Sequence, residues 1–240
     1  MAVAAEPLLS VEDLHVRYGA FEAVRGVSFS LHAGEILGIV GESGSGKSTV
    51  AKVVIGLERP SAGRVAFATP RPVVQMVFQD AVGSLNPRMT VRQALDEALA
   101  HAPQGRRGGL TARDLTERVG LSEAVLGQYP REMSGGQCQR VSIARALATR
   151  PDALVADEPV SALDVSVQAR VLNLLRDLRR EMGLAILLVA HDLAVVKNVC
   201  DRVCVMERGV FVDAGAAEDV FERPRSEYTR RLLSAVPTIG

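Results

Sequence analysis

The stretch Gly41-Glu42-Ser43-Gly44-Ser45-Gly46-Lys47-Ser48-Thr49 decides the fold of this chain. It matches the pattern G-x-x-x-x-G-K-[ST], whose glycines let the backbone wrap around a chain of phosphate groups. The apolar run from Glu35 to Val40 precedes it and predicts a buried strand, and a helix is expected from Gly46 to about Leu57. A strand, a glycine-rich turn and a helix in this order are the context that the phosphate-binding motif requires.

Each part of this loop has a chemical task. Backbone N–H groups in the turn point inward, and the N-terminus of the following helix adds a partial positive charge at the same place. Lys47 can reach the β- and γ-phosphates of a nucleoside triphosphate, and the Ser48 hydroxyl can hold Mg²⁺. The alternative is a chance Gly/Ser-rich turn before a helix, but that does not explain why strand, lysine and hydroxyl are all in register.

Most of the remaining chain alternates between strand and helix patterns. Strands are expected at residues 11–18, 73–78, 153–156, 185–190 and 203–206, and an amphipathic helix at 165–182. The composition changes after Gln79. There Thr90 is expected to cap a helix to about His101, and Thr111 to cap one through Val119. We therefore expect an α/β core with a small helical lobe inserted into it.

Composition and charge narrow the class of protein. The 240 residues fit one domain, and 48% are apolar and 23% charged, as in ordinary globular proteins. Acidic and basic residues balance at 28 each, which argues against a protein that coats nucleic-acid phosphates. No apolar run reaches the roughly 18 residues that span a bilayer, and residues 1–9 do not resemble a signal peptide, so we expect a cytoplasmic location.

The three cysteines, Cys138, Cys200 and Cys204, fit a reducing compartment. Cys200 and Cys204 lack the close spacing that is usual for a metal-binding pair. We expect both to be small, buried apolar residues beside neighbouring valines.

Two acidic residues, Asp157 and Glu158, follow the expected strand at 153–156. An acid at the carboxyl end of a strand in an open α/β sheet faces the ligand crevice. We expect Asp157 to complete the Mg²⁺ shell and Glu158 to orient or deprotonate an attacking water. Without the phosphate loop, the same two residues would fit a surface turn better.

A second glycine-rich helix start occurs at Ser134-Gly135-Gly136-Gln137. Ser134 can cap the helix that follows, and the glycines allow the backbone to approach an anion closely. One phosphate loop needs only one such site for its triphosphate, so we expect the second to serve another subunit's nucleotide. The alternative, a glycine-containing helix start without a ligand, is common for any single turn of this kind.

Taken together and in order, these motifs resemble the ATP-binding subunits of ABC transporters over essentially the whole chain. Met133 to Gln137 resembles the family signature, with Met where Leu is usual. Ser161-Ala162-Leu163-Asp164 resembles the D-loop of the dimer interface. His191 resembles the switch histidine that contacts the γ-phosphate, Gln79 the Q-loop glutamine, and Tyr18 the aromatic residue that stacks on adenine.

The resemblance implies a fold and a set of working residues. We expect a P-loop RecA-like core with a mixed sheet, an N-terminal antiparallel β portion and an inserted α-helical subdomain. The single ABC ATPase domain, residues 1–240, would then divide into a core of 1–83 and 136–240 and a helical subdomain of 84–135. The expected cofactors are ATP and Mg²⁺. The expected catalytic residues are Lys47, Gln79, Glu158 and His191; the metal would be held by Ser48, Gln79 and Asp157; the nucleotide would contact Tyr18, residues 41–49, residues 134–137 and Asp164.

Longer stretches resemble one branch of the family, the importers of peptides and nickel. They are Phe78 to Met89, Gln137 to Arg140, Glu158 to Ser166 and Tyr228 to Pro237. Members of that branch import dipeptides, oligopeptides, nickel and metal–opine complexes. The implied partners are a second ATP-binding subunit, identical or paralogous, two membrane-spanning permease subunits and, indirectly, a solute-binding protein, without nucleic acid. The implied location is peripheral, on the cytoplasmic face of the cell membrane.

Two other classes of function remain open from the sequence. One is a soluble ABC ATPase that acts on DNA or ribosomes, against which stand the neutral charge, the lack of a long coiled-coil insertion and the single cassette. The other is a P-loop kinase or GTPase-like switch. Ser134 to Gln137 and His191 argue against it, and no guanine-recognition motif Asn-Lys-x-Asp is present.

Overall fold

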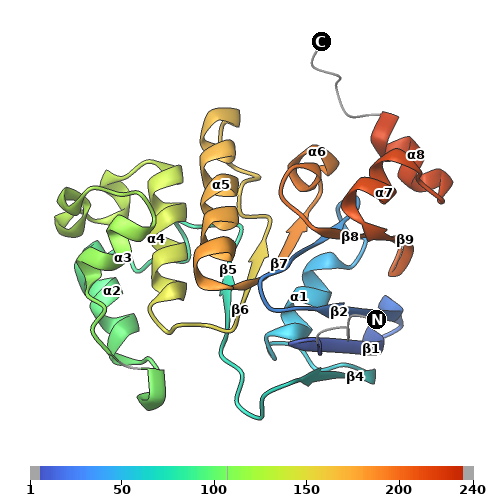
Figure 1. Ribbon diagram of the computed structural model, residues 1–240, viewed down its shortest axis with the longest axis horizontal. Coiled ribbons are helices and arrows are strands. Elements are labelled where there is room, and N and C mark those ends of the chain that lie inside the picture. The colour runs from blue at the N-terminus through green and yellow to red at the C-terminus, as the bar shows by residue number, and fades with distance from the viewer. Residues whose placement is uncertain (1–5, 107, 235–240) are drawn as a thin grey trace.

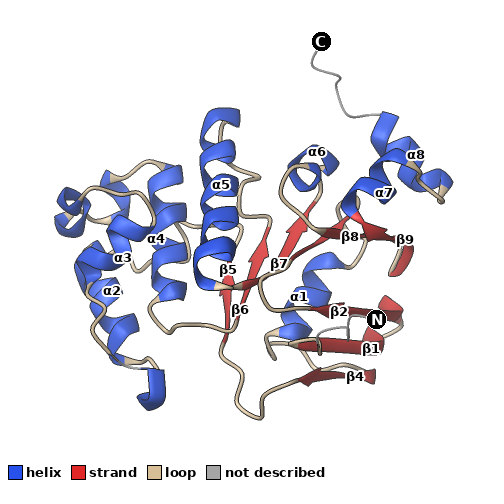
Figure 2. Cartoon of the chain, viewed as in Figure 1, coloured by secondary structure: helices blue, strands red, loops and turns tan. Residues whose placement is uncertain are grey.

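The computed structural model describes residues 6–106 and 108–234, which form two β-sheets with helices packed around them (Figures 1 and 2). The strands are β1 (Leu9–Tyr18), β2 (Phe21–Leu31), β3 (Ile36–Val40), β4 (Ala62–Phe67), β5 (Val74–Val77), β6 (Ala153–Asp157), β7 (Ala185–Ala190), β8 (Arg202–Glu207) and β9 (Val210–Ala216). The α-helices are α1 (Lys47–Val54), α2 (Val91–Ala100), α3 (Ala112–Arg118), α4 (Gly135–Leu147), α5 (Val165–Met182), α6 (Leu193–Lys197), α7 (Ala217–Glu222) and α8 (Glu227–Ser234). Three short 3₁₀ turns, η1 (Gln104–Arg106), η2 (Glu123–Gly127) and η3 (Pro130–Glu132), lie among α2, α3 and α4.

The larger sheet has six strands in the order β5-β6-β7-β3-β8-β9. The pairs from β5 to β8 are parallel, and β9 is antiparallel to β8, so the sheet is mixed as expected. The carboxyl ends of β3, β6 and β7 therefore meet at one edge of the sheet. This is the edge where ligands bind in open α/β sheets.

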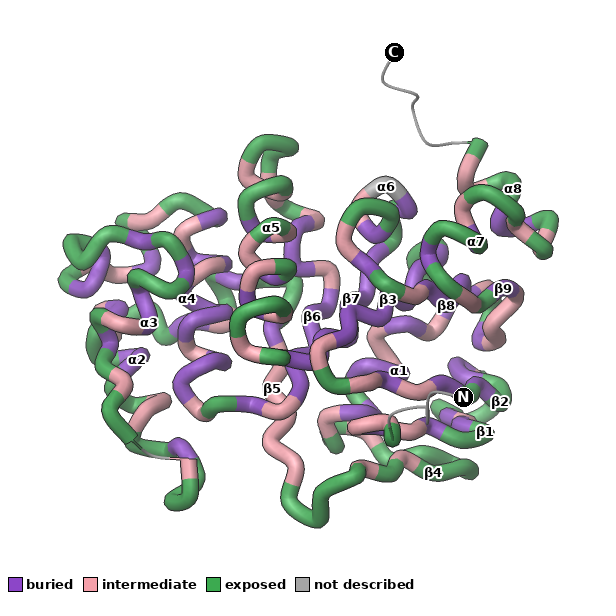
Figure 3. Tube along the Cα trace, viewed as in Figure 1, coloured by how far each residue is buried: buried purple, intermediate pink, exposed green. Residues whose placement is uncertain are grey.

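Strand side chains alternate between two hydrophobic cores on opposite faces of this sheet. In β6, Leu154 and Ala156 pack into the core shared with α2 to α8, whereas Ala153 and Val155 pack towards the smaller sheet. In β7, Ile186 and Leu187 divide in the same way. A strand buried on both faces needs an unbroken apolar run, which is why these segments lack the polar alternation of surface strands (Figure 3).

The smaller sheet is antiparallel, with three strands in the order β2-β1-β4. Its strands β1 and β2 form a hairpin in which Tyr18 pairs with Phe21 across the turn. Helix α1 lies between the two sheets in Figure 1, and Val50, Ala51 and Val54 pack into the core that both sheets share. The predicted N-terminal antiparallel portion is confirmed, and its hairpin ends beside the start of α1.

Helices α2, α3 and α4 lie together at one end of the molecule, left in Figure 1. Thr90 and Thr111 cap α2 and α3 as expected, each accepting a hydrogen bond from the backbone N–H three residues later. Leu95 of α2 and Leu115 of α3 belong to the same core cluster as Ile186 of β7, so the helical lobe shares a core with the sheet. Its division from the core at residues 84 and 135 stays a prediction, since α4 itself begins at Gly135.

Several element boundaries differ from the expectations for local reasons. The helix expected to reach Leu57 ends at Val54, because Gly56 takes a left-handed φ of 77°. Between the helices expected after Thr90 and Thr111, the structure adds the short turn η1. Among the residues that the structure describes, no helix combines the length and the apolarity needed to cross a membrane.

Cys200 and Cys204 are buried and free, as expected for small apolar residues. Burial raises the pKa of the Cys204 thiol to about 12. Within residues 6–106 and 108–234, no group of three or more His, Cys, Asp or Glu side chains could hold a metal ion by itself.

Candidate nucleotide site

The phosphate loop joins the end of β3 to the start of α1. Gly46, the N-cap of α1, has φ 108° and the helix has no side-chain cap, so the first N–H groups of α1 are left for a ligand. A Cβ atom on Gly41 would lie 2.1 Å from the Met206 carbonyl oxygen, and one on Gly46 would lie 2.5 Å from the Ala23 carbonyl oxygen. Glycine is therefore required at both positions by the close approach of neighbouring backbone.

Lys47 folds back onto the loop that precedes it. Its side chain is buried, and Nζ donates to the carbonyl oxygens of Gly41 and Glu42, both at 2.8 Å. Burial lowers the pKa of Lys47, while attraction from Glu158 and Asp157 acts against this shift. The ammonium group is therefore held by neutral carbonyls in a partly desolvated place, where phosphate oxygens would be strong partners.

Ser48 and Asp157 meet between α1 and β6. The Ser48 hydroxyl donates to Oδ1 of Asp157 at 3.0 Å. Burial raises the pKa of Asp157; the hydrogen bond from Ser48 lowers it and the nearby Glu158 charge raises it further. This pair suits Mg²⁺, which prefers hard oxygen ligands and commonly takes one or two protein carboxylates together with substrate phosphates.

Glu158 and His191 approach each other from adjacent parallel strands. Glu158 follows β6 with φ 46°, its N–H donates to the Val189 carbonyl at 2.9 Å, and His191 follows β7. Oε2 of Glu158 lies 3.3 Å from Nδ1 of His191. The side chain of Glu158 is 17% exposed and that of His191 52% exposed, so the acid is shielded while the imidazole faces outward. A left-handed non-glycine residue at this place is the kind of backbone strain that often accompanies function.

One pocket of about 370 Å³ brings many of the predicted residues together. Tyr18 stands at its rim, 44% exposed, and its hydroxyl donates to Oε2 of Glu58 at 3.1 Å. A smaller adjoining pocket is lined by Glu158 and His191. The 370 Å³ pocket is lined by Tyr18, Phe21, Ala23, Ser43, Gly44, Gly46, Lys47, Ser48, Thr49, Gln79 and Glu158.

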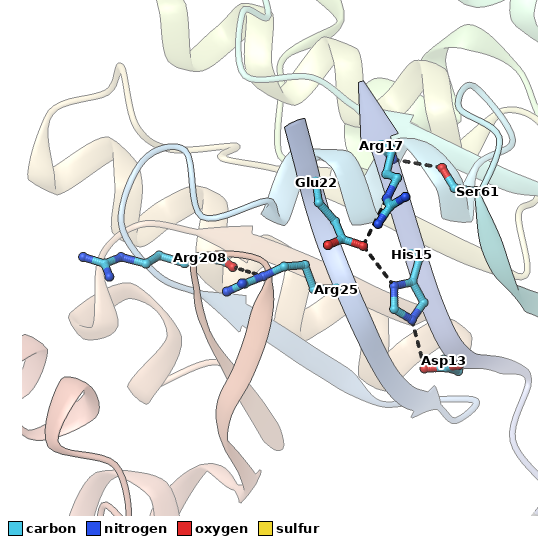
Figure 4. Close-up of polar contacts among 7 residues, drawn as sticks. All are labelled: Asp13, His15, Arg17, Glu22, Arg25, Ser61 and Arg208. Atoms are coloured by element: carbon cyan, nitrogen blue, oxygen red, sulfur yellow. Dashed lines mark hydrogen bonds and ion pairs between the residues drawn. The ribbon is translucent and has the colours of Figure 1, made fainter. Parts of the chain in front are cut away.

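A polar network holds the hairpin that carries Tyr18 (Figure 4). Oε1 of Glu22 lies 3.4 Å from Nδ1 of His15 and accepts a hydrogen bond from Nε of Arg17 at 3.3 Å. The hydrogen bond with His15 is the main reason that the pKa of Glu22 is lowered. The Arg17 N–H also donates to the Ser61 hydroxyl at 2.9 Å, which ties β1 to the start of β4. These contacts fix the position of the aromatic rim of the pocket.

The residues of the second helix start lie outside this pocket. Ser134 accepts from the Gln137 N–H at 3.3 Å, and Oε1 of Gln137 accepts from the Ser134 N–H at 2.9 Å, so the two residues cap α4 reciprocally. Gly136 is buried against α5, where a Cβ atom would lie 2.3 Å from Cγ1 of Val167. Asp164 caps α5 by accepting from the Val167 N–H at 3.0 Å. The structure thus separates the predicted site residues into two groups within one chain.

Sequence reasoning missed two features of the pocket wall. Phe21 is 63% exposed and lines the pocket beside Tyr18, its cross-strand partner. Ala23 lies further along the same strand, β2, for which no strand was expected. The turn Gly19-Ala20 between two apolar-patterned stretches was the available signal for the hairpin.

The fold and the pocket define a P-loop nucleotide-binding protein. A buried parallel sheet, an uncapped helix start, a lysine folded into the loop and an acid at the end of the adjoining strand are its structural elements.

Comparison with known proteins gives the family. Residues 24–161 match the family model described as ABC transporter. An oligopeptide transport ATP-binding protein, OppF, of Escherichia coli strain K12 is 47% identical over 259 residues, covering 96% of this chain and 78% of that protein. The OppF protein of Lactococcus lactis subsp. lactis strain IL1403 is 42% identical over 258 residues, covering 97% of this chain and 81% of its own length. The chain belongs to the ABC transporter family, as one of its ATP-binding and ATP-hydrolysing cassettes.

Solved structures agree with this assignment. The cbiO1 protein of Clostridium perfringens, described as part of the transporter complex cbiONQ, superposes with a TM-score of 0.79 at 28% identity, covering 91% of this chain and 92% of that one. The cassette MJ1267 in its ADP conformation gives 0.78 at 26% identity, covering 95% and 99%. The dimeric cassette MJ0796 in a post-hydrolysis state with ADP and phosphate gives 0.73 at 27% identity, covering 87% and 98%.

Proposed function

We propose that this chain hydrolyses ATP as half of a head-to-tail pair of cassettes and that the pair drives a membrane importer of peptides. The single observation that carries the proposal is the 370 Å³ pocket, where Lys47 and Glu158 meet although they lie far apart in the sequence. The pocket supports ATP binding. The names of the relatives support the direction of transport and the substrate class.

The roles of the chain's own residues follow from their positions. Residues 41–49 cradle the phosphates with backbone N–H groups. The Lys47 ammonium has three N–H donors, so it can bind phosphate oxygens while the Gly41 carbonyl still holds it. Glu158 accepts a proton from the water that attacks the γ-phosphorus, and the bond from that phosphorus to ADP breaks. His191, 3.3 Å from Glu158, fixes the orientation of the carboxylate and reaches the γ-phosphate. Tyr18, with Phe21 beside it, stacks on the adenine ring.

Mg²⁺ would be held by Ser48 and Asp157, with Gln79 at the same pocket. When bound, the ion supplies Lewis-acid polarisation of the phosphate oxygens. A bound cation would stabilise the ionised form of Asp157, which burial disfavours when no cation is present.

The second half of the nucleotide site would come from a partner cassette. The Ser134 to Gln137 turn does not line this chain's pocket, so it is available to cover the γ-phosphate of a nucleotide held by another subunit. Asp164 begins the neighbouring helix, α5, and would lie at the same interface. The partner can be a copy of this chain or a paralogue.

A groove between the sheet and the helical lobe is suited to a permease. It encloses about 600 Å³ and mixes apolar side chains, among them Leu57 and Phe78, with Glu97 and Arg145. Leu57, Phe78 and the nearby Val82 are exposed apolar residues, and Gln79 follows Phe78 directly. A membrane-spanning partner docked here at the cytoplasmic face would contact the segment that carries Gln79, and so would be coupled to the nucleotide pocket.

Transport in whole cells tests this proposal. A strain lacking this gene and its close paralogues should lose uptake of labelled tri- to pentapeptides and regain it with the wild-type chain, but not with Glu158→Gln. Nickel uptake is measured in the same strains, because the sequence also resembles nickel importers. Restored nickel uptake without peptide uptake would show that nickel, rather than peptides, is the substrate. Restoration of peptide uptake by Glu158→Gln would overturn the proposed role of ATP hydrolysis.

A further inference from the structure

The peptide group between Gly41 and Glu42 is hydrogen-bonded at both ends. Its carbonyl oxygen, on Gly41, accepts from Nζ of Lys47 at 2.8 Å. Its N–H, on Glu42, donates to the hydroxyl of Tyr228 at 3.1 Å. Tyr228 belongs to α8, 186 residues further along the chain, and is not part of the phosphate-loop motif.

Tyr228 is itself firmly placed. Its side chain is 6% exposed and packs into the larger core. The turn before α8 is held by Asp213 of β9, whose Oδ2 accepts from the N–H groups of Arg225 at 2.8 Å and Ser226 at 3.3 Å. The Ser226 hydroxyl in turn accepts from the Tyr228 N–H at 3.1 Å. The hydroxyl that meets the phosphate loop is therefore fixed by β9 and by the core rather than by the loop.

We propose that Tyr228 is a positioning residue for the ATPase reaction, which acts through the Gly41–Glu42 peptide group on Lys47. A peptide group is planar and stiff, so its N–H and C=O turn together. By holding the N–H, Tyr228 sets the direction of the Gly41 carbonyl, and that carbonyl holds the Lys47 ammonium beside the pocket. This inference rests on the proposed role of the phosphate loop in binding ATP.

The surroundings indicate what is lost when the hydroxyl is removed. A pocket of about 440 Å³ lies between the loop and α8 and is lined by Glu42, Ser43, Tyr228, Arg231 and other residues. Water can enter there and satisfy the Glu42 N–H, so the loop need not collapse. Water lacks the anchoring of a buried ring, and the peptide group becomes free to rotate. The loop is then less ordered before ATP binds, and ordering it on binding lowers the affinity for ATP.

Tyr228→Phe in the full chain is the test, because it keeps the ring and removes only the hydroxyl. We expect the Glu42 amide to exchange its hydrogen at least about tenfold faster by NMR, as expected when a native hydrogen bond is lost. We expect the KM for MgATP to rise about fivefold, in line with one lost hydrogen bond, and kcat to change less than twofold. A merely structural role would lower both activity and thermal stability without this separation of KM from kcat.

Two further variants make the outcome decisive. Ser234→Ala removes a side-chain hydrogen bond at the other end of α8, to the Arg231 carbonyl, and should leave the KM within twofold. An equal rise in KM for Ser234→Ala, or unchanged Glu42 exchange and KM in Tyr228→Phe, would overturn the role of the hydroxyl. Lys47→Ala should lose ATP binding; if it still binds and hydrolyses ATP normally, the role of the phosphate loop fails instead.

Discussion

The two glycine-rich helix starts of this chain differ in what satisfies their first backbone N–H groups. At α1 the N-cap is Gly46, which has no side chain, and the basic group of Lys47 is folded back onto loop carbonyls. At α4 the N-cap is Ser134, and a reciprocal pair of hydrogen bonds with Gln137 occupies its cap. The first start is open to an anion in its own chain's pocket; the second has an internal acceptor for its Gln137 N–H and lies outside that pocket.

The glycines of the two starts are also used differently. Gly41 and Gly46 lie against backbone carbonyls of Met206 in β8 and Ala23 in β2, so strands of both sheets fix the loop before α1. Gly136 lies against the side chain of Val167, so the start of α4 is packed against a second helix. Motifs that look alike in sequence are thus packed against backbone carbonyls in one case and against a neighbouring side chain in the other.

Glu158→Gln is the largest expected effect and tests the chemistry on the α1 side. The amide cannot accept a proton, so kcat for ATP hydrolysis should fall about 10³-fold, while ATP binding is retained because the phosphate loop is unchanged. Steady-state hydrolysis and equilibrium binding of ATP measure the two quantities separately. Hydrolysis within tenfold of wild type would remove Glu158 from the role of base.

Ser134→Arg tests whether the α4 start works on a partner's nucleotide. The longer cationic side chain should prevent closure of the pair, and hydrolysis should fall about 100-fold, the scale of losing a group that stabilises transition-state charge. ATP affinity of the isolated chain should be unchanged, since residues 134–137 do not line its pocket.

The matched control is Ser122→Arg, which places the same side chain on another exposed N-cap in the helical lobe. It should keep hydrolysis within twofold of wild type. Weaker ATP binding by the isolated Ser134→Arg chain would contradict the separation of the two helix starts.

Gly136→Ala tests the packing at the α4 start. The new Cβ atom would meet Val167 at 2.3 Å, so the free energy of unfolding should fall by about 2 kcal/mol from overpacking. Gly135→Ala is the control, because its Cβ atom would lie 3.4 Å from Leu163, an ordinary contact. Denaturant unfolding of both variants measures the difference. Equal stability of the two would mean that Gly136 is not required by packing.

Asp157→Asn is expected to have the smallest effect, and it concerns the thermal stability contributed by the carboxylate that contacts Ser48 of α1. The pKa of Asp157 is raised by burial above its usual value of 3.8, so the folded chain binds this proton more tightly than the unfolded chain. Stability contributed by this group therefore decreases as pH rises above that value. At pH 7 the neutral amide should raise Tm by about 2 °C, and the gain should shrink as pH is lowered towards 4.

Asp96→Asn, on the exposed face of α2, is the control and should leave Tm unchanged at both pH values. A drop in Tm for Asp157→Asn at pH 7 would show that the carboxylate stabilises the free protein.

Much of the fold, including the region around α1, could be predicted because the sequence signals for these elements lie close together along the chain. The apolar run 35–40, the loop and the helix are consecutive, and Thr90, Thr111 and Ser134 cap helices where their own neighbours predict it. The strands 153–156 and 185–190 were found because strands buried on both faces are continuously apolar.

The elements and contacts that the sequence did not predict depend on segments that lie far apart along the chain. The exposed Phe21 and the half-buried Glu22 of β2 obscured its apolar pattern, and β2 is fixed by pairing with β1. Helix α8 was not expected, although its residues were noted as a family resemblance; residues 235–237 of that stretch lie outside the described residues. The contact of Tyr228 with Glu42 spans 186 positions, and no local pattern carries such information.

The register between β6 and β7 has a consequence for tolerance to insertions and deletions. Asp157 pairs with Val189, and the N–H of Glu158 is bonded to the carbonyl of that same residue. Side chains alternate along a strand, so a single residue added to or removed from β6 would exchange the directions of the two acids without altering either one. The position of Glu158, the proposed base, therefore depends on the spacing of the chain as much as on the identity of the residue.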